Sequence, residues 1–179
     1  MMPMNRFVPL AAALVVVATE TAASAQVMGA EIGGATGMEA GDDGTGTTAF
    51  RRARTRLRAS VLWQTEEGNS GMSAIAFVEI EPHTSFGNEI RYTYAFSRRM
   101  EAFGGATGTW VPHILIGGVA GATFLFGKSD MRLFVEPSIS ALPFGTDLPT
   151  SGVLMWGLLS IGVRGDISSL VAEKSGDEK

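Results

Sequence analysis

One arrangement of residues in this chain could carry out acyl transfer. His83 and Ser85 stand two positions apart and Glu89 follows closely, so a carboxylate could orient a histidine that activates the serine. The same residues come directly after Pro82, where a polar turn is the ordinary expectation. We therefore favour a polar turn, with no catalytic residue, and keep His83 and Ser85 as the minor alternative.

Charged side chains also recur at alternate positions, with apolar residues between them. Glu79 and Glu81 could act as an acid/base pair, and the arginines from Arg51 to Arg58 could bind phosphate groups of a lipid or polysaccharide. Arginine is also suited to bidentate pairing with carboxylates in an interior. The simpler expectation is a charge network inside a narrow lumen, formed by Arg56, Arg58, Glu79, Glu81, Arg91, Arg132, Glu136 and Arg164.

Period-two alternation requires β-strands to position these side chains. The segment 131–141 shows it most clearly, with apolar residues at most odd positions and polar residues at most even ones. A tilted strand of about 9–11 residues is also what crosses a bilayer. Pro137 cannot donate to a strand ladder, so we expect a bulge or a broken ladder there. The predicted strands are 55–64, 72–81, 89–97, 100–110, 113–126, 131–141 and 153–167.

These seven strands suggest an all-β fold, an antiparallel up-and-down transmembrane β-barrel of about eight strands. Closed single-chain bacterial barrels normally have an even number of strands. The missing strand is expected either in the glycine-rich part of the chain or in 49–54.

The chain divides into four parts by composition. Residues 1–25 read as a cleavable signal peptide, with Arg6, an apolar core at 8–18 and the small residues Ala23-Ser24-Ala25. Residues 26–50 are rich in Gly and Thr and lack apolar periodicity, so they are expected to be a flexible segment. The barrel domain follows at 51–167, and 168–179 form a charged tail.

Composition excludes several classes of function. The chain has no cysteine, so an exported form cannot use disulfides. The net charge of −4 does not favour nucleic-acid binding. The two histidines, His83 and His113, lack ligand spacing, so we expect no metal site. No phosphate loop or nucleotide fingerprint appears, so we expect no other cofactor.

Three features favour a membrane barrel over a soluble exported β-domain. Both signs of charge lie within the predicted strands, where they could neutralise one another across a lumen. Lysine, which soluble sheets commonly carry on exposed edges, occurs only at Lys128 between residues 51 and 170. Aromatic residues fall near strand ends, as at the two interfaces of a bilayer: Trp63, Trp110 and Phe144, and less clearly Tyr92 and Tyr94. A helical alternative rests on residues 110–127, which contain Gly117-x-x-x-Gly121. Pro112, His113 and the turn at 127–130 oppose it.

Residues 54–167 resemble the small eight-stranded outer-membrane barrels of Gram-negative bacteria. The segments HILIGGVAGATFLFG, GKSD, RLFVEPSISALPF and WGLLSIGVRGDI carry the resemblance. It implies outer-membrane lipid and the barrel insertion machinery as partners. Such barrels usually end in an aromatic residue, whereas here a tail to Lys179 follows the last strand. The pair His83 and Ser85 resembles the His/Ser pair of the lipid A deacylase barrels, without the rest of that pattern.

The resulting expectation is a small outer-membrane protein with a structural, adhesive or small-ligand transport role and no catalytic activity. Two alternatives stay open: a membrane-embedded lipid-modifying hydrolase that uses His83 and Ser85, and a soluble periplasmic ligand-binding β-domain. The sequence leaves the ligand and the oligomeric state undetermined.

Overall fold

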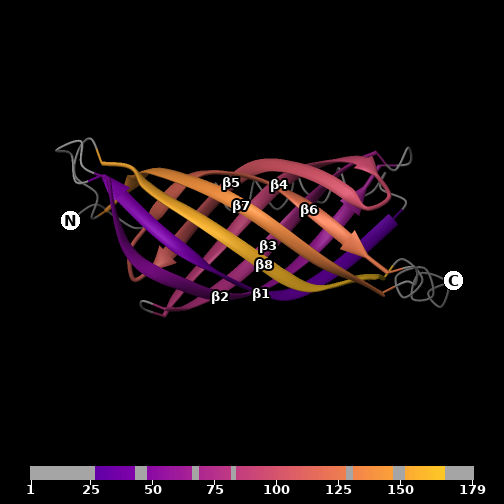
Figure 1. Cartoon of the computed structure of the whole chain (residues 1–179), viewed down its shortest axis with the longest axis horizontal. Coiled ribbons are helices and arrows are strands. Elements are labelled where there is room, and N and C mark those ends of the chain that lie inside the picture. The colour runs from indigo at the N-terminus through magenta and orange to yellow at the C-terminus, as the bar shows by residue number, and fades with distance from the viewer. Residues whose placement is uncertain are drawn as a thin grey trace, which may run out of the picture.

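A computed structural model of the chain shows a closed barrel of eight antiparallel strands (Figure 1). The structure describes residues 27–42, 48–65, 69–81, 84–127, 131–146 and 152–167. Each strand pairs with its neighbours in sequence, and the first strand pairs with the last to close the sheet. The strands are β1 (Val27–Asp42), β2 (Thr48–Gln64), β3 (Ser70–Glu81), β4 (Ser85–Ser97), β5 (Met100–Val111), β6 (Leu115–Phe126), β7 (Met131–Gly145) and β8 (Leu154–Asp166).

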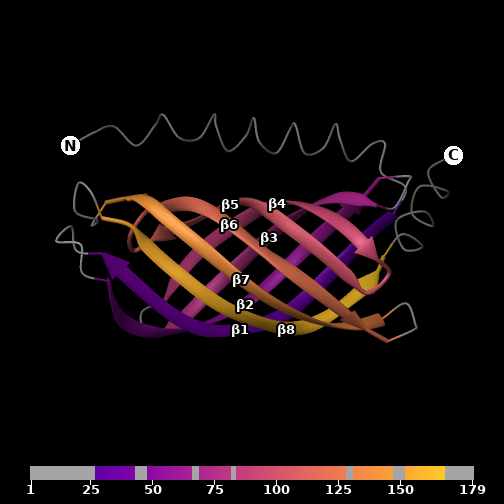
Figure 2. The same cartoon turned by 45° about the horizontal axis from the view of Figure 1, so that its top comes forward.

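The two ends of the barrel both carry short connections. β1 begins and β8 ends at the same end, on the right in Figure 1, and we call it the terminal end. The connections 65–69, 98–99 and 127–130 lie there, and 43–47, 82–84, 112–114 and 146–153 lie at the opposite end. Figure 2 shows the strands crossing the long axis of the barrel obliquely, as a closed sheet requires.

The eighth strand is β1, in the glycine-rich segment that we expected to be flexible. That expectation is wrong, because residues 27–42 form β1 and residues 48–50 begin β2. Two inward positions of β1 require glycine. A Cβ atom at Gly33 would lie 2.6 Å from the Ile161 carbonyl oxygen and 3.0 Å from Cζ of Phe134. Glycine therefore lets β1 approach β8. On the outward face, Gly34 and Thr36 interrupt the apolar alternation by which a strand is recognised.

The other seven predicted strands are present, with ends that differ by up to seven residues. Because β1 is part of the sheet, the barrel begins at Val27 rather than at residue 51. The helical alternative for 110–127 is wrong, because this stretch forms the end of β5 and the whole of β6. No helix in the described part of the chain is long and apolar enough to span a bilayer. The predicted signal peptide (1–25) and charged tail (168–179) lie outside the described residues.

The predicted break at Pro137 is confirmed on one side of β7. The β6–β7 ladder pairs Gly121 with Ser138 and Phe124 with Val135, but the residues between these two pairs are not paired. The β7–β8 ladder continues through Pro137 without a shift. The missing proline N–H thus interrupts the sheet on its β6 side.

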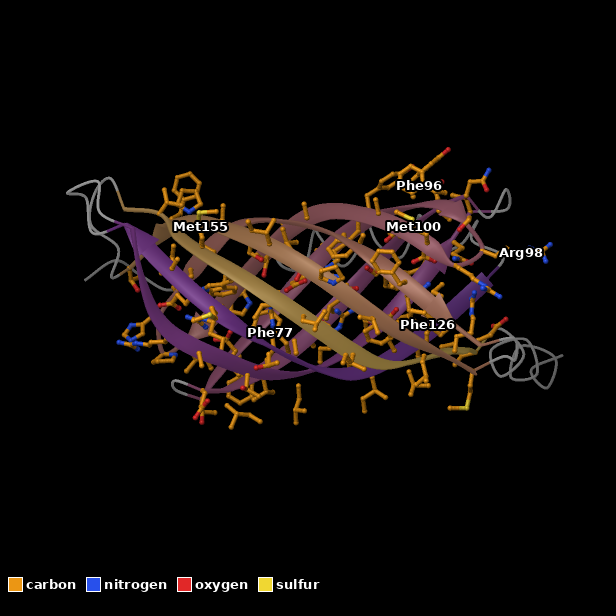
Figure 3. The ribbon with its side chains drawn as sticks, viewed as in Figure 1. Phe77, Phe96, Arg98, Met100, Phe126 and Met155 are labelled. Atoms are coloured by element: carbon orange, nitrogen blue, oxygen red, sulfur yellow. The ribbon has the colours of Figure 1, made fainter. Side chains whose placement is uncertain are left out.

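Alternation separates two chemically different surfaces. Large apolar side chains cover the outside, including Leu57 on β2, Tyr92 on β4 and Leu133 on β7. Figure 3 shows outward side chains near both ends, with Phe96 and Met100 at the terminal end and Met155 at the opposite end. The inside is mostly polar, apart from a small apolar cluster toward the opposite end, formed by Leu142, Leu154, Trp156 and Leu158.

Candidate functional site: the charged lumen

The lumen network begins with three arginines on the inward face of β2. Arg54, Arg56 and Arg58 are all buried, whereas Leu57 between them is exposed on the outside. Because successive side chains of a strand point to opposite faces, one register places all three guanidinium groups in the lumen. Their partners come from strands across the barrel.

Glu136 of β7 is the centre of the network. Its carboxylate pairs with Arg58 of β2 and accepts a hydrogen bond from Nη1 of Arg91 of β4 at 2.8 Å. Oγ1 of Thr123, on β6, donates to the same carboxylate at 3.1 Å. Glu136 thus joins four strands, and it is almost completely buried.

Toward the terminal end, the network continues through Glu31 of β1. Nη2 of Arg58 donates to Oε2 of Glu31 at 2.8 Å, and Oγ of Ser60 donates to the same oxygen at 3.0 Å. Nε of Arg164 donates to Oε1 of Glu31 at 2.7 Å. Arg164 of β8 also reaches Glu101 of β5 at 2.7 Å, so the ion pairs extend across the lumen.

In the other direction, the network continues through Glu89 of β4. Glu89 pairs with Arg91 two positions along the same strand, and Nη1 of Arg56 lies 2.9 Å from its Oε1. Opposite charges alternate along the whole series, which keeps a buried array close to neutral. The series runs Glu101, Arg164, Glu31, Arg58, Glu136, Arg91, Glu89, Arg56.

A second, smaller group lies toward the opposite end. Arg54 donates through Nε to Glu39 at 2.6 Å and through Nη1 to Glu79 at 2.5 Å. Oγ of Ser85, the first residue of β4, donates to Oε2 of Glu79 at 2.6 Å. One arginine is therefore shared by two carboxylates, and a hydroxyl group supplies a further hydrogen bond to one of them.

Aromatic rings stack against the guanidinium groups and fill the remaining space. The guanidinium carbon lies 4.0 Å from the ring centroid for Arg91 over Phe103 and 4.3 Å for Arg54 over Trp156. The space bounded by Arg56, Arg58, Ile75, Phe77, Glu89, Arg91 and Ser160 is too narrow to admit a water molecule. This part of the lumen is thus packed with ion pairs and rings.

Six of the eight predicted network residues form ion pairs in the lumen. Arg56, Arg58, Arg91, Glu136 and Arg164 belong to the main series, and Glu79 belongs to the smaller group with Arg54. The other two share the inward phase but lie at the mouths of the barrel. Glu81 is exposed at the end of β3, and Arg132 at the start of β7 donates to the Arg98 carbonyl oxygen at 3.5 Å.

Five members of the network are not among the eight predicted network residues. Alternation along β2 already predicts Arg54 on the lumen face beside Arg56 and Arg58, although the predicted network did not include it. Glu89 also stands at the alternate position of Arg91, so the strand period alone could have placed it inside. Glu31 and Glu39 were missed because the strand that carries them was not recognised, and Glu101 because the glycines of β5 obscure its alternation.

The two catalytic candidates are not brought into a described pair. Ser85 is buried and its hydroxyl group donates to Glu79, while His83 lies outside the described residues. Among the residues that the structure describes, no group of three or more His, Cys, Asp or Glu side chains could hold a metal ion.

Comparison with known proteins identifies the fold. No protein-family model matches the chain, and no curated protein sequence matches it significantly. Two structures of Ail, the attachment invasion locus protein of Yersinia pestis, align with TM-scores of 0.50. One, in complex with the heparin analogue sucrose octasulfate, is 8% identical, and the other is 9% identical. The alignments cover 76% of this chain and 98% and 97% of Ail. Neisserial surface protein A aligns with a TM-score of 0.45 and 12% identity, covering 77% of this chain and 96% of that one. The chain has the closed eight-stranded fold of the small outer-membrane barrels.

Proposed function

We propose that the protein is a membrane-spanning barrel of an outer membrane with a structural, non-conducting role. The observation that carries this proposal is the combination of an apolar outside with a lumen filled by paired charges. An apolar outside suits lipid, and a closed barrel pairs its backbone polar groups from strand to strand, as a bilayer demands of a spanning protein.

The outer surface supports insertion through its aromatic residues. Phe86 and Phe96 are ten positions apart on the outward face of β4, and both are exposed. Ten residues of antiparallel strand extend about 34 Å. At a tilt of ~40° this corresponds to roughly 26 Å along the barrel axis, which agrees with the apolar band of outer-membrane barrels. Trp110 at the opposite end donates through Nε1 to Asn88 at 2.6 Å, so its polar edge is satisfied near that boundary.

The geometry favours a structural role over transport or adhesion. Transport through the lumen would have to separate the ion pairs around Glu136, because the space beside them does not admit water. Adhesion normally uses long external loops on a barrel scaffold, whereas the connections here contain between two and eight residues.

The hydrolase alternative is disfavoured by the position of Ser85. Its hydroxyl group is buried and already donates to a carboxylate, and a nucleophilic serine needs access to the substrate. A deacylase assay on outer-membrane lipid, with Ser85→Ala as the control, is expected to show no difference between the two proteins. Activity that disappears in Ser85→Ala would reverse this conclusion.

Two measurements test the proposal. After cell fractionation, the protein is expected in the outer-membrane pellet, and unboiled samples are expected to migrate differently from boiled ones on a gel. In planar bilayers, the wild-type barrel is expected to give no discrete conductance steps. Recovery in the soluble periplasm would exclude the membrane role, and stable conductance steps would exclude the sealed lumen.

A further inference from the structure

We infer that the β4–β5 turn at the terminal end binds the phosphate headgroup of an anionic phospholipid. The inference rests on the proposed membrane role and adds a ligand to it. The turn consists of Arg98 and Arg99, and both side chains are exposed. Figure 3 shows Arg98 extending beyond the end of the barrel, past Phe96 and Met100.

The backbone of this turn is held in place by the neighbouring strands. The Leu125 amide of β6 donates to the Arg99 carbonyl oxygen at 2.9 Å, and Nη1 of Arg132 of β7 donates to the Arg98 carbonyl oxygen at 3.5 Å. The Arg99 amide donates to Oγ of Ser97 at 3.3 Å. These contacts fix the main chain and bring a third guanidinium group beside the turn, so less conformational freedom is lost on binding.

The charge of the turn is available, in contrast to that of the lumen arginines. Every arginine of the lumen network pairs with a buried glutamate. No carboxylate of the described residues pairs with the side chain of Arg98 or Arg99. Guanidinium groups match the geometry of phosphate oxygens and bind them bidentately. An anionic ligand with phosphate oxygens is therefore the natural partner.

The apolar surface beside the turn selects a lipid among phosphate-containing ligands. Phe96 is 63% exposed and Phe126 53% exposed, and Met100 begins the strand that follows the turn. The Tyr94 and Phe96 rings pack edge to face with centroids 5.3 Å apart, which gives a firm apolar wall. One phospholipid could place its phosphate on the arginines and its acyl chains along this wall.

The test uses the full barrel in nanodiscs of phosphatidylcholine with a minor fraction of phosphatidylglycerol. Native mass spectrometry after release would count the lipids retained by each protein. Wild type is expected to retain phosphatidylglycerol over phosphatidylcholine. Because each basic residue at an anionic surface contributes roughly fivefold, Arg98→Gln/Arg99→Gln should lower this preference about 25-fold. Arg98→Lys/Arg99→Lys should keep part of it, since the charge remains but the bidentate geometry is lost.

Arg52→Gln is the control, because it removes an exposed arginine near the opposite end. An equal loss of preference in Arg52→Gln and the double glutamine variant would overturn the inference, as would an unchanged preference in the double variant. Displacement of the lipid by millimolar inorganic phosphate would show that the acyl chains do not contribute, and this would also overturn it. If the double variant does not fold, Arg99→Gln alone serves in its place.

Insertion distinguishes failure of this inference from failure of the proposed function. Heat-modifiable migration of the wild-type barrel in the same nanodiscs would establish that it is folded in lipid. A folded, inserted barrel without a preference for phosphatidylglycerol contradicts the lipid site alone. A barrel that does not enter nanodiscs contradicts the membrane role itself.

Discussion

Phe134 and Gly162 lie directly opposite each other across β7 and β8, and the ring of Phe134 occupies the space that a side chain at position 162 would need. The same pairing recurs between Phe77 and Gly87 and between Phe103 and Gly121. A guanidinium group lies over each of the three rings. Each glycine thus makes room for a ring, and each ring supports an arginine of the network.

The first prediction tests this packing with two glycines of β8. In Gly162→Ala the new Cβ atom would lie 2.6 Å from Cε1 of Phe134, and it would also meet the Ile32 carbonyl oxygen. Such overpacking typically costs about 1–3 kcal/mol. Gly157→Ala is the matched control, because its Cβ atom would meet nothing within 4 Å. Unfolding by guanidinium chloride in detergent micelles should show a lower midpoint than wild type for Gly162→Ala only. Equal midpoints for the two variants would contradict the packing argument.

The second prediction concerns the centre of the network. Glu136→Gln keeps the shape of the side chain but removes the negative charge that pairs with Arg58 and Arg91. Removing one member of a buried pair costs about 3–5 kcal/mol, because the remaining charges stay buried without compensation.

Glu81→Gln is the control for this substitution, since Glu81 is exposed at the mouth of the barrel. Its free energy of unfolding should stay within about 0.5 kcal/mol of wild type. Chemical denaturation of both variants in the same detergent makes the comparison. A Glu136→Gln protein as stable as Glu81→Gln would show that the ion pairs contribute little to the barrel.

Where the alternation was clear, the strand period predicted which residues face the lumen, but not which of them pair. Met131–Ala141 and Arg54, Arg56 and Arg58 of β2 point as their alternation requires. The partners of Arg58 depend on the closure of the barrel, because Glu136 lies 78 positions away in the sequence. Pairing across a lumen is set by strand register and tilt, and these emerge only when all eight strands are in place.

β1 escaped recognition for a different physical reason. Its inward positions include Gly33 and Gly37, which allow the close approach of β8. Its outward positions, which carry the apolar signal of a strand in this barrel, include Gly34 and Thr36, so composition suggested flexibility instead. Its two glutamates, Glu31 and Glu39, occupy the inward phase and would have indicated a strand only if the lumen network had already been known.

The third prediction concerns the break in the β6–β7 ladder at Pro137. Thr123→Val removes the hydroxyl group that donates to Glu136 beside the break at Pro137. Losing a hydrogen bond to a charged group costs about 1.5–3 kcal/mol. Thr107→Val is the control, because Oγ1 of Thr107 is buried and has no hydrogen-bond partner within the described structure. It should be neutral or stabilising.

Amide hydrogen exchange adds a readout that global stability does not give. In Thr123→Val, exchange relative to wild type should accelerate for the amides of β6 and β7 next to the break in their ladder. It should change less for the amides of β2 and β3, whose ladder is continuous from Arg56 to Gln64. Uniform acceleration over the whole barrel would contradict a local role for Thr123.

The fourth prediction separates a membrane barrel from a soluble one by the depth of two outward residues. Ile139 and Met131 lie on the same face of β7, Ile139 near the middle of the strand and Met131 at the terminal end. In a bilayer, Ile139→Lys should cost about 2–4 kcal/mol, because an ammonium group is then placed in the apolar band, whereas Met131→Lys should cost about 0–1 kcal/mol near the interface. In a water-soluble barrel both lysines would be solvated, and neither should destabilise the protein by more than about 0.5 kcal/mol.

Unfolding of the two variants in phospholipid vesicles therefore tests the membrane assignment without reference to any ligand. A large loss for Ile139→Lys together with a small loss for Met131→Lys supports the proposed membrane-spanning role, and two equally stable variants would exclude it.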